Sequence, residues 1–167
     1  MTTRLASVLP LLLMGAVAYP QQVKTDFDRS APFATYRTYT WTSGTPAPNQ
    51  FIQERIHVAV DEQLVVKGML TQSAVKPNLV VATHVVTHEQ KEIVAPGFGV
   101  GPWWGGPGAV IETYLQGTLI VDLYDAKTRK MVWRGVATDT VSEKTSTNTE
   151  HIDKAVAKMF EKYPPTD

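Results

Sequence analysis

Two strand-like segments separated by a short polar turn constrain the fold of this chain more than any other feature. Residues 117–125 and 131–141 flank the turn-like segment Ala-Lys-Thr-Arg at residues 126–129. Strands joined by so short a connection pair antiparallel, so the pattern predicts a β-hairpin. Symmetric closure about the turn would place two sets of side chains on opposite faces. One set is Leu119, Val121, Leu123, Val132 and Val136, and the other is Ile120, Tyr124, Met131 and Trp133.

Three further segments have the composition of strands. Residues 23–28 alternate strictly between two sets of side chains, which is the period of a half-buried strand. Residues 37–41 predict a second short strand, with Tyr39 and Trp41 on one face. Residues 79–87 are largely apolar on both faces, which is typical of a central strand. With the hairpin, these segments predict a sheet of about five strands.

Two segments have the period of an amphipathic helix. Asn49 is a suitable N-cap for a helix that ends near residue 67, and Gly68 is placed to terminate it. A second helix is predicted to begin at a capping box, residues 147–150, and to end before the Pro-Pro pair at 164–165. The apolar stripe of the first helix is Ile52, Ile56, Val60 and Leu64, and that of the second is Ile152, Val156, Met159, Phe160 and Tyr163.

Strands and helices in these proportions predict an α+β domain. Each helix must cover its apolar stripe, and the sheet provides the surface for it. We expect a two-layer fold, in which a mostly antiparallel sheet of about five strands has both amphipathic helices packed on one face. The length of 167 residues, of which 43% are hydrophobic and 19% charged, suits one such domain with its own core.

The N-terminal residues have the pattern of a cleavable signal peptide. Arg4 precedes the mostly apolar residues 5–17, and residues 16–18 form the small-x-small sequence of a cleavage site. The apolar run is too short for a membrane-spanning helix, and no later segment reaches the length that a span needs. We therefore expect residues 1–18 to be removed, which leaves a single domain at residues 19–167 in the periplasm or outside the cell.

Composition excludes several classes of function. The chain has no cysteine, which excludes a disulfide framework, a thiolate metal site, a cysteine nucleophile and the lipid-bearing cysteine of a lipoprotein. Sixteen basic residues balance sixteen acidic residues, so the chain as a whole has no electrostatic attraction to nucleic acid or to an anionic membrane. We expect neither a nucleic-acid partner nor a lipid anchor.

Several motifs occur together in an order that is typical of one known family. They include FATYRTYTW at residues 33–41, PNLVVA at 77–82, GTLIVDLYDAKTRKMVWRG at 117–135 and IDKAV at 152–156, followed by Tyr-Pro-Pro. Over roughly residues 23–165 they resemble the bacterial envelope family called domain of unknown function 4136 (DUF4136). The resemblance implies an envelope protein and supplies no catalytic residue. Many members look like lipoproteins, from which this cysteine-free chain departs.

Residues 95–109, with the sequence APGFGVGPWWGGPGA, are rich in glycine, proline and large aromatic side chains. Because glycine and proline disfavour a helix or a continuous strand, the segment predicts a loop. Such a loop either covers the second face of the domain's own sheet or presents its aromatic side chains to a partner. The candidate binding residues are Phe98, Trp103 and Trp104 in this loop, with Tyr124 and Trp133 on the adjacent sheet face.

Two histidines suggest a metal site. His84 and His88 have the HxxxH spacing of helical zinc ligands, and Glu89 and Glu92 follow closely. The segment is predicted to be a strand, however, where four residues separate Cα atoms by about 13 Å. That separation is too wide for tetrahedral ligation by two nearly parallel side chains. We therefore expect no metal and no cofactor.

The charged residues of the hairpin allow a second catalytic hypothesis, an acid pair with a basic partner. The residues concerned are Asp122, Asp125, Arg134 and Asp139. Asp122 and Asp125 are three positions apart, so they face opposite sides of a continuous strand. We therefore expect solvated charges of strand faces and turns rather than a catalytic pair.

These observations favour a non-enzymatic envelope domain. It would bind another envelope protein or a glycan through residues 95–109 and the adjacent aromatic sheet face. The alternative is a metal-dependent hydrolase that uses His84 and His88. A third hypothesis is a structural subunit that self-associates through its sheet edges.

Overall fold

Six strands form one mixed sheet in a computed structural model that describes residues 21–68, 70–94, 110–142 and 145–166. The elements in chain order are β1 (Gln22–Phe27), the short 3₁₀ helix η1 (Phe33–Thr35), β2 (Thr38–Trp41), α1 (Gln50–Val66), β3 (Thr71–Gln72), β4 (Leu79–Val94), β5 (Val110–Asp125), β6 (Met131–Thr140) and α2 (Thr145–Met159). The order across the sheet is β1-β6-β5-β4-β2-β3.

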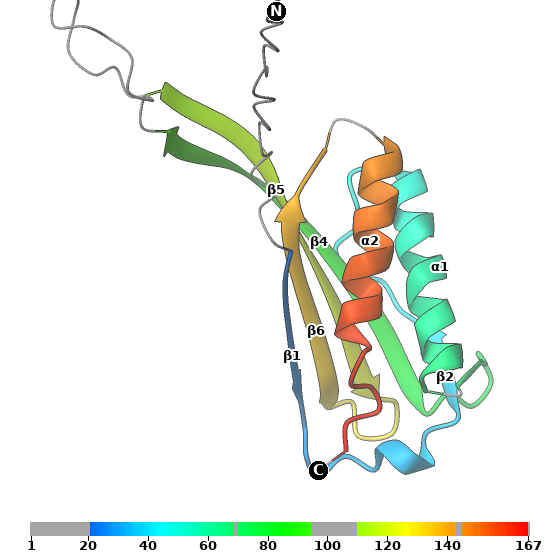
Figure 1. The fold of residues 1–167 in the computed structure, drawn as a ribbon. Coiled ribbons are helices and arrows are strands. Elements are labelled where there is room, and N and C mark those ends of the chain that lie inside the picture. Colours follow the sequence, from blue (N-terminus) through cyan, green and yellow to red (C-terminus); the bar gives the residue numbers. More distant parts are fainter. Residues whose placement is uncertain (1–20, 69, 95–109, 143–144, 167) are drawn as a thin grey trace, which may run out of the picture.

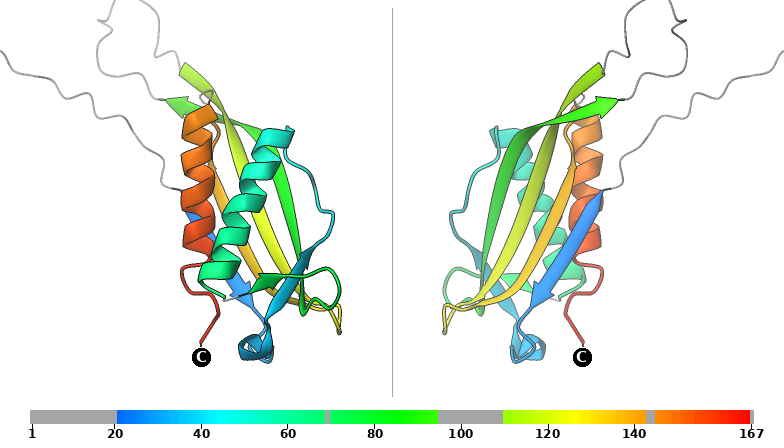
Figure 2. Two further views of the ribbon diagram at one scale, coloured as in Figure 1. Left: turned by 90° about the vertical axis from the view of Figure 1, so that its right-hand side faces the viewer. Right: turned by 90° about the vertical axis from the view of Figure 1, so that its left-hand side faces the viewer.

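Antiparallel pairing dominates the sheet. The pairs β1/β6, β6/β5 and β5/β4 are antiparallel, whereas β2 pairs in parallel with both β4 and β3. Both helices lie on the same face of the sheet, and the other face carries no helix among the described residues (Figures 1 and 2). The predicted two-layer α+β fold is confirmed, with the two-residue strand β3 as the sixth strand.

Both helices pack their predicted stripes against the sheet. Asn49 caps α1 as expected, because its side chain accepts a hydrogen bond from the backbone N–H of Ile52 over 3.0 Å. Gly68 follows the helix where a Cβ atom would lie 2.9 Å from both the Leu64 carbonyl oxygen and the Tyr163 ring. The buried helix residues include Ile56, Val60, Leu64, Val156 and Met159, and together with Phe160, which directly follows α2, they join Leu79, Val81, Val121 and Leu123 in one continuous core.

The start of α2 differs from the expectation. The helix begins at Thr145, two residues before the predicted capping box. Asn148, a member of that box, instead binds the preceding chain, accepting from the Ser142 N–H over 2.8 Å and donating to the Ser142 carbonyl over 2.7 Å. The amphipathic period therefore located the helix, while its first turn was displaced by a contact with the end of β6.

A β-bulge overturns the predicted faces of the β5–β6 hairpin. Leu123 pairs with Trp133, but Tyr124 pairs with Met131, so Val132 is an extra residue in β6. One inserted residue exchanges the two faces of a strand, because side chains alternate with a period of two. Trp133 therefore lies in the core under the helices, and its predicted place on the outer face with Tyr124 is wrong. For the same reason, Val136 pairs with Ile120 rather than sharing a face with the inner residues.

No helix of the described chain is long and apolar enough to span a membrane.

Candidate functional site

The hairpin of β4 and β5 continues beyond the rest of the sheet. The two strands pair along all of their 16 residues. β6 pairs with β5 no farther than Gln116, and β2 pairs with β4 only up to Val81. Among the described residues, no third strand lies beside residues 90–94 and 110–114, and we call these two segments the arm. Figure 1 shows the arm projecting away from the helix-covered body.

The arm is built differently from the body. Gln90, Lys91 and Thr113 are exposed, and so are His88 and Leu115 at its base. An isolated two-stranded hairpin is marginally stable in water. The edge of a sheet is also a template on which another strand can pair. The arm is therefore the part of the described sheet whose two strands have no third strand beside them.

The arm connects to the aromatic loop predicted as a binding element. Phe98, Trp103 and Trp104 lie outside the described residues, so their role stays a prediction. The two candidates on the sheet, Tyr124 and Trp133, are separated by the structure. Trp133 is 2% exposed and packs against Phe160 and Tyr163, whereas Tyr124 lies on the outer face with partial exposure.

Tyr124 belongs to a polar cluster on the outer face. At its centre is Asp122, which is completely buried although none of the described helices covers this face. Arg134 donates two hydrogen bonds to it, from Nε over 2.6 Å and from a terminal nitrogen over 2.7 Å. The Tyr124 hydroxyl donates a weaker bond to Asp122 over 3.3 Å. The expectation that Asp122 is a solvated strand charge is therefore wrong.

Electrostatics hold this cluster together. Burial raises the pKa of Tyr124, and the neighbouring negative charge of Asp122 raises it further. The bidentate contact with Asp122 raises the pKa of Arg134. Tyr124 is therefore held protonated and Arg134 charged across the neutral range, which is the arrangement that compensates a buried carboxylate.

The two histidines of the metal hypothesis have different surroundings. His84 Nδ1 accepts from the backbone N–H of Thr45 over 3.1 Å, which places the proton of the neutral ring on Nε2. His84 Nε2 lies 3.7 Å from Asp122, whereas His88 is exposed and stands opposite Gln116 on β5. Within the described ranges, no group of three or more His, Cys, Asp or Glu side chains could hold a metal ion.

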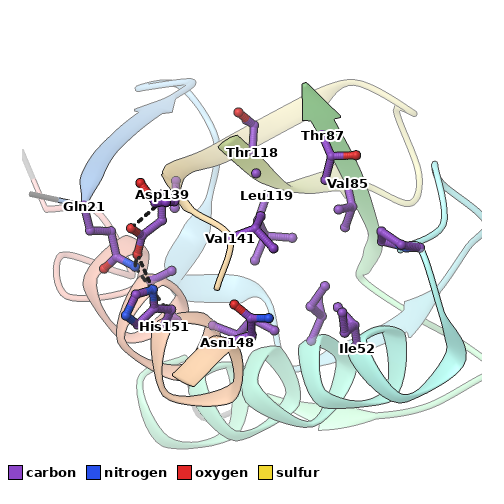
Figure 3. Close-up of a pocket in the computed structure, with 17 residues that line it drawn as sticks. Gln21, Ile52, Val85, Thr87, Thr118, Leu119, Asp139, Val141, Asn148 and His151 are labelled. Atoms are coloured by element: carbon purple, nitrogen blue, oxygen red, sulfur yellow. Dashed lines mark hydrogen bonds and ion pairs between the residues drawn. The ribbon is translucent and has the colours of Figure 1, made fainter. Parts of the chain in front are cut away.

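A cavity of about 110 Å³ lies where the hairpin leaves the body. The N-terminal parts of α1 and α2 form one side of it, and the middle of β4, the middle of β5 and the end of β6 form the other. Figure 3 shows Ile52, Val85 and Leu119 directed into it, with Asp139 and His151 at its rim. Sequence analysis missed this cavity, because its lining comes from five elements whose individual apolar residues all look like ordinary core.

Sequence comparison identifies a family but no function. The profile of the family described as Domain of unknown function (DUF4136) matches residues 23–165, which is nearly the whole chain. This confirms the resemblance inferred from the motifs. No curated protein matches the chain.

Solved structures similar to this one share its fold at low sequence identity. A PDZ domain protein from Parabacteroides distasonis ATCC 8503 has a TM-score of 0.59 and 18% identity over 88% of this chain. The match covers 37% of that protein, so this chain corresponds to about a third of its length. Two structures of the PelC dodecamer from Paraburkholderia phytofirmans have TM-scores of 0.50, with 14% and 12% identity, over 84% of this chain and 97% of theirs.

Proposed function

This chain belongs to the DUF4136 family, and on that premise we propose that it is a non-enzymatic binding or assembly module of the bacterial cell envelope. The observation that carries the proposal is the arm, where β4 and β5 continue together beyond every other strand of the described sheet. A two-stranded ribbon with no third described strand beside it is suited to pair with a strand of a second molecule. Its partner is another envelope protein or a glycan.

Export follows from the signal-like residues 1–18. Their removal would leave Tyr19 as the first residue, and without a cysteine the product would be released into the periplasm or the medium. Mass spectrometry of the protein recovered from a periplasmic fraction measures this directly. A mass that begins at Tyr19 supports export with cleavage, and a protein retained in the cytoplasm with residues 1–18 intact contradicts it.

Removing the arm tests the binding role. Residues 89–115 are replaced by Asn-Gly, which joins His88 to its partner Gln116 by a two-residue hairpin turn. The helix-covered core lies outside the deleted segment, so we expect the unfolding midpoint in urea to change little. We expect the envelope partners recovered by crosslinking and affinity capture to be lost.

A matched pair of variants distinguishes partner binding by the aromatic loop from nonspecific binding by any exposed aromatic side chain. The double variant Trp103→Ala/Trp104→Ala should lose the same partners as the arm deletion. Phe51→Ala is the control, because Phe51 is a large aromatic residue that is 81% exposed on α1. Recovery of every partner by both the deletion and the double tryptophan variant would contradict the proposal.

The same samples test the two remaining hypotheses. Light scattering of the intact protein reports self-association through sheet edges, and the dodecameric PelC structures make a dodecamer one specific outcome to look for. Metal analysis of undepleted protein tests the hydrolase that would use His84 and His88. Stoichiometric zinc, manganese or iron that is lost in His84→Ala/His88→Ala would favour the enzyme instead.

A further inference from the structure

The cavity between the helices and the sheet has the features of a ligand site. Six apolar side chains from both layers form its interior: Ile52, Ile56, Val85, Leu119, Ala137 and Ile152. The cavity lies beside the base of the arm, where Thr87 of β4 and Gly117 of β5 line it. A preformed apolar cavity takes apolar groups, as enclosed engineered cavities of about 150 Å³ do when they bind benzene.

Two polar side chains at the rim, Gln21 and Asn148, are held by hydrogen bonds to neighbouring groups. Gln21 donates from Nε2 to Asp139 Oδ2 over 2.9 Å and to the His151 carbonyl over 3.0 Å. Asn148 is held by its two hydrogen bonds to Ser142. Figure 3 shows Gln21, Asp139 and His151 gathered at one side of the opening. The apolar interior therefore selects an apolar group, and the rim contacts whatever remains outside.

Charge at the rim restricts the part of the ligand that stays outside. The Asp139 side chain is 20% exposed, and His151 Nδ1 lies 3.1 Å from its carboxylate. Asp139 is the one carboxylate among the residues that line the cavity, and no lysine or arginine is among them. A carboxylate or phosphate placed there would be repelled in partly desolvated surroundings, whereas a cationic or uncharged head group would not.

The volume limits how much of the ligand enters. At about 110 Å³ the cavity is smaller than the engineered cavities of about 150 Å³ that bind one benzene molecule, so it has room for only a small apolar group. A whole lipid does not fit, but the end of a single acyl or alkyl chain does. We propose that this cavity binds the chain end of a single-chain amphiphile whose head group is cationic or uncharged.

Three probes of equal chain length and different head group test the site. Decyltrimethylammonium, decanol and decanoate are titrated below their micellar concentrations into the intact protein, followed by backbone amide NMR shifts. We expect the first two to shift the amides of Val85, Leu119 and Ala137 and decanoate to bind at least fivefold more weakly. Asp139→Asn should remove that difference. Equal binding of all three, or shifts confined to other parts of the chain, would overturn the proposal.

A substitution that fills the cavity, with a matched substitution outside it as the control, provides a second test. Ala155 is buried at the cavity wall, whereas Ala157 is exposed on the same helix. Ala155→Leu should weaken binding at least tenfold, and Ala157→Leu should leave it unchanged. Val85→Phe fills the cavity from the strand side and replaces Ala155→Leu if that variant does not fold. Undiminished binding by a folded cavity-filling variant contradicts the site. This outcome is independent of the arm deletion, because removal of residues 89–115 leaves the residues that line the cavity in place.

Discussion

Leu123 and Asp122 are neighbours on β5, and both are completely buried, yet they lie on opposite faces of the sheet. Leu123 is covered by the helix layer and belongs to the continuous apolar core. Asp122 has no helix above it among the described elements, and its cover consists of the side chains of Arg134, Tyr124 and His84. The two faces therefore bury the same strand by different means.

The difference shows what each face tolerates. Hydrophobic burial on the inner face depends on volume and shape, so it responds most to changes of side-chain size. Burial on the outer face depends on charge compensation, since a carboxylate without a partner is costly to remove from water. Substitutions on the two faces should consequently differ both in size of effect and in what rescues them.

Trp133→Ala should have the largest effect. Trp133 is 2% exposed and packs against Phe160 and Tyr163, and Gly135 leaves room for it, because a Cβ atom there would lie 2.6 Å from the indole. Loss of a buried tryptophan costs about 3–5 kcal/mol of unfolding free energy, measurable by urea denaturation. A cost below about 1 kcal/mol would mean that the side chain is on the outer face, as the symmetric hairpin had predicted.

Asp122→Ala should cause the next largest loss of unfolding free energy. It removes the acceptor of two short hydrogen bonds from Arg134, whose side chain is 42% exposed and can regain water. We expect a loss of about 1–3 kcal/mol, smaller than for a fully enclosed pair. The double variant Asp122→Ala/Arg134→Met should recover part of it, because no unpaired charge then remains. Additive costs in this double-mutant cycle would show that the two side chains are not coupled.

The smallest effect concerns two tyrosines, one associated with each face. Burial, together with its hydrogen bond to Asp125, raises the pKa of Tyr36 in the core to about 12, and burial beside Asp122 raises the pKa of Tyr124. A raised pKa contributes stability that is present below the ordinary value of 10.0 and is lost as the pH rises through the folded value.

Absorbance titration of tyrosinate and urea unfolding between pH 9 and 12 measure this loss. The free energy of unfolding of each variant, Tyr36→Phe or Tyr124→Phe, should fall less steeply with pH than that of the unsubstituted protein. The difference should be larger for Tyr36, which is more buried. Identical pH slopes for all three proteins would show that neither hydroxyl is perturbed by its surroundings.

Local patterns predicted the elements well because their causes are local. The stripe of Ile56, Val60 and Leu64 repeats within one helix, and Asn49 caps that helix through a contact three residues away. The hairpin of β5 and β6 also follows from a short connection. Each of these inferences needs only a few neighbouring residues, so the rest of the chain did not have to be known.

The candidate site was less accessible to sequence reasoning. Tyr124 was placed correctly on the outer face, but Trp133 was not, because the bulge at Val132 is visible only in the pairing of the two strands. The burial of Asp122 depends on the same register, which sets Arg134 directly opposite it. Phe98, Trp103 and Trp104 lie outside the described residues and stay predictions.

The sequence by itself determined the α+β class, the two amphipathic helices, the hairpin and the family, because these follow from periodicity and from motifs along the chain. Tertiary structure alone decided which face each hairpin side chain occupies, how far the arm extends and where the cavity lies. The physical reason is that side chains alternate between the two faces of a strand, so one extra residue moves every following side chain to the opposite face. A cavity likewise exists only where separate elements fail to fill the space between them.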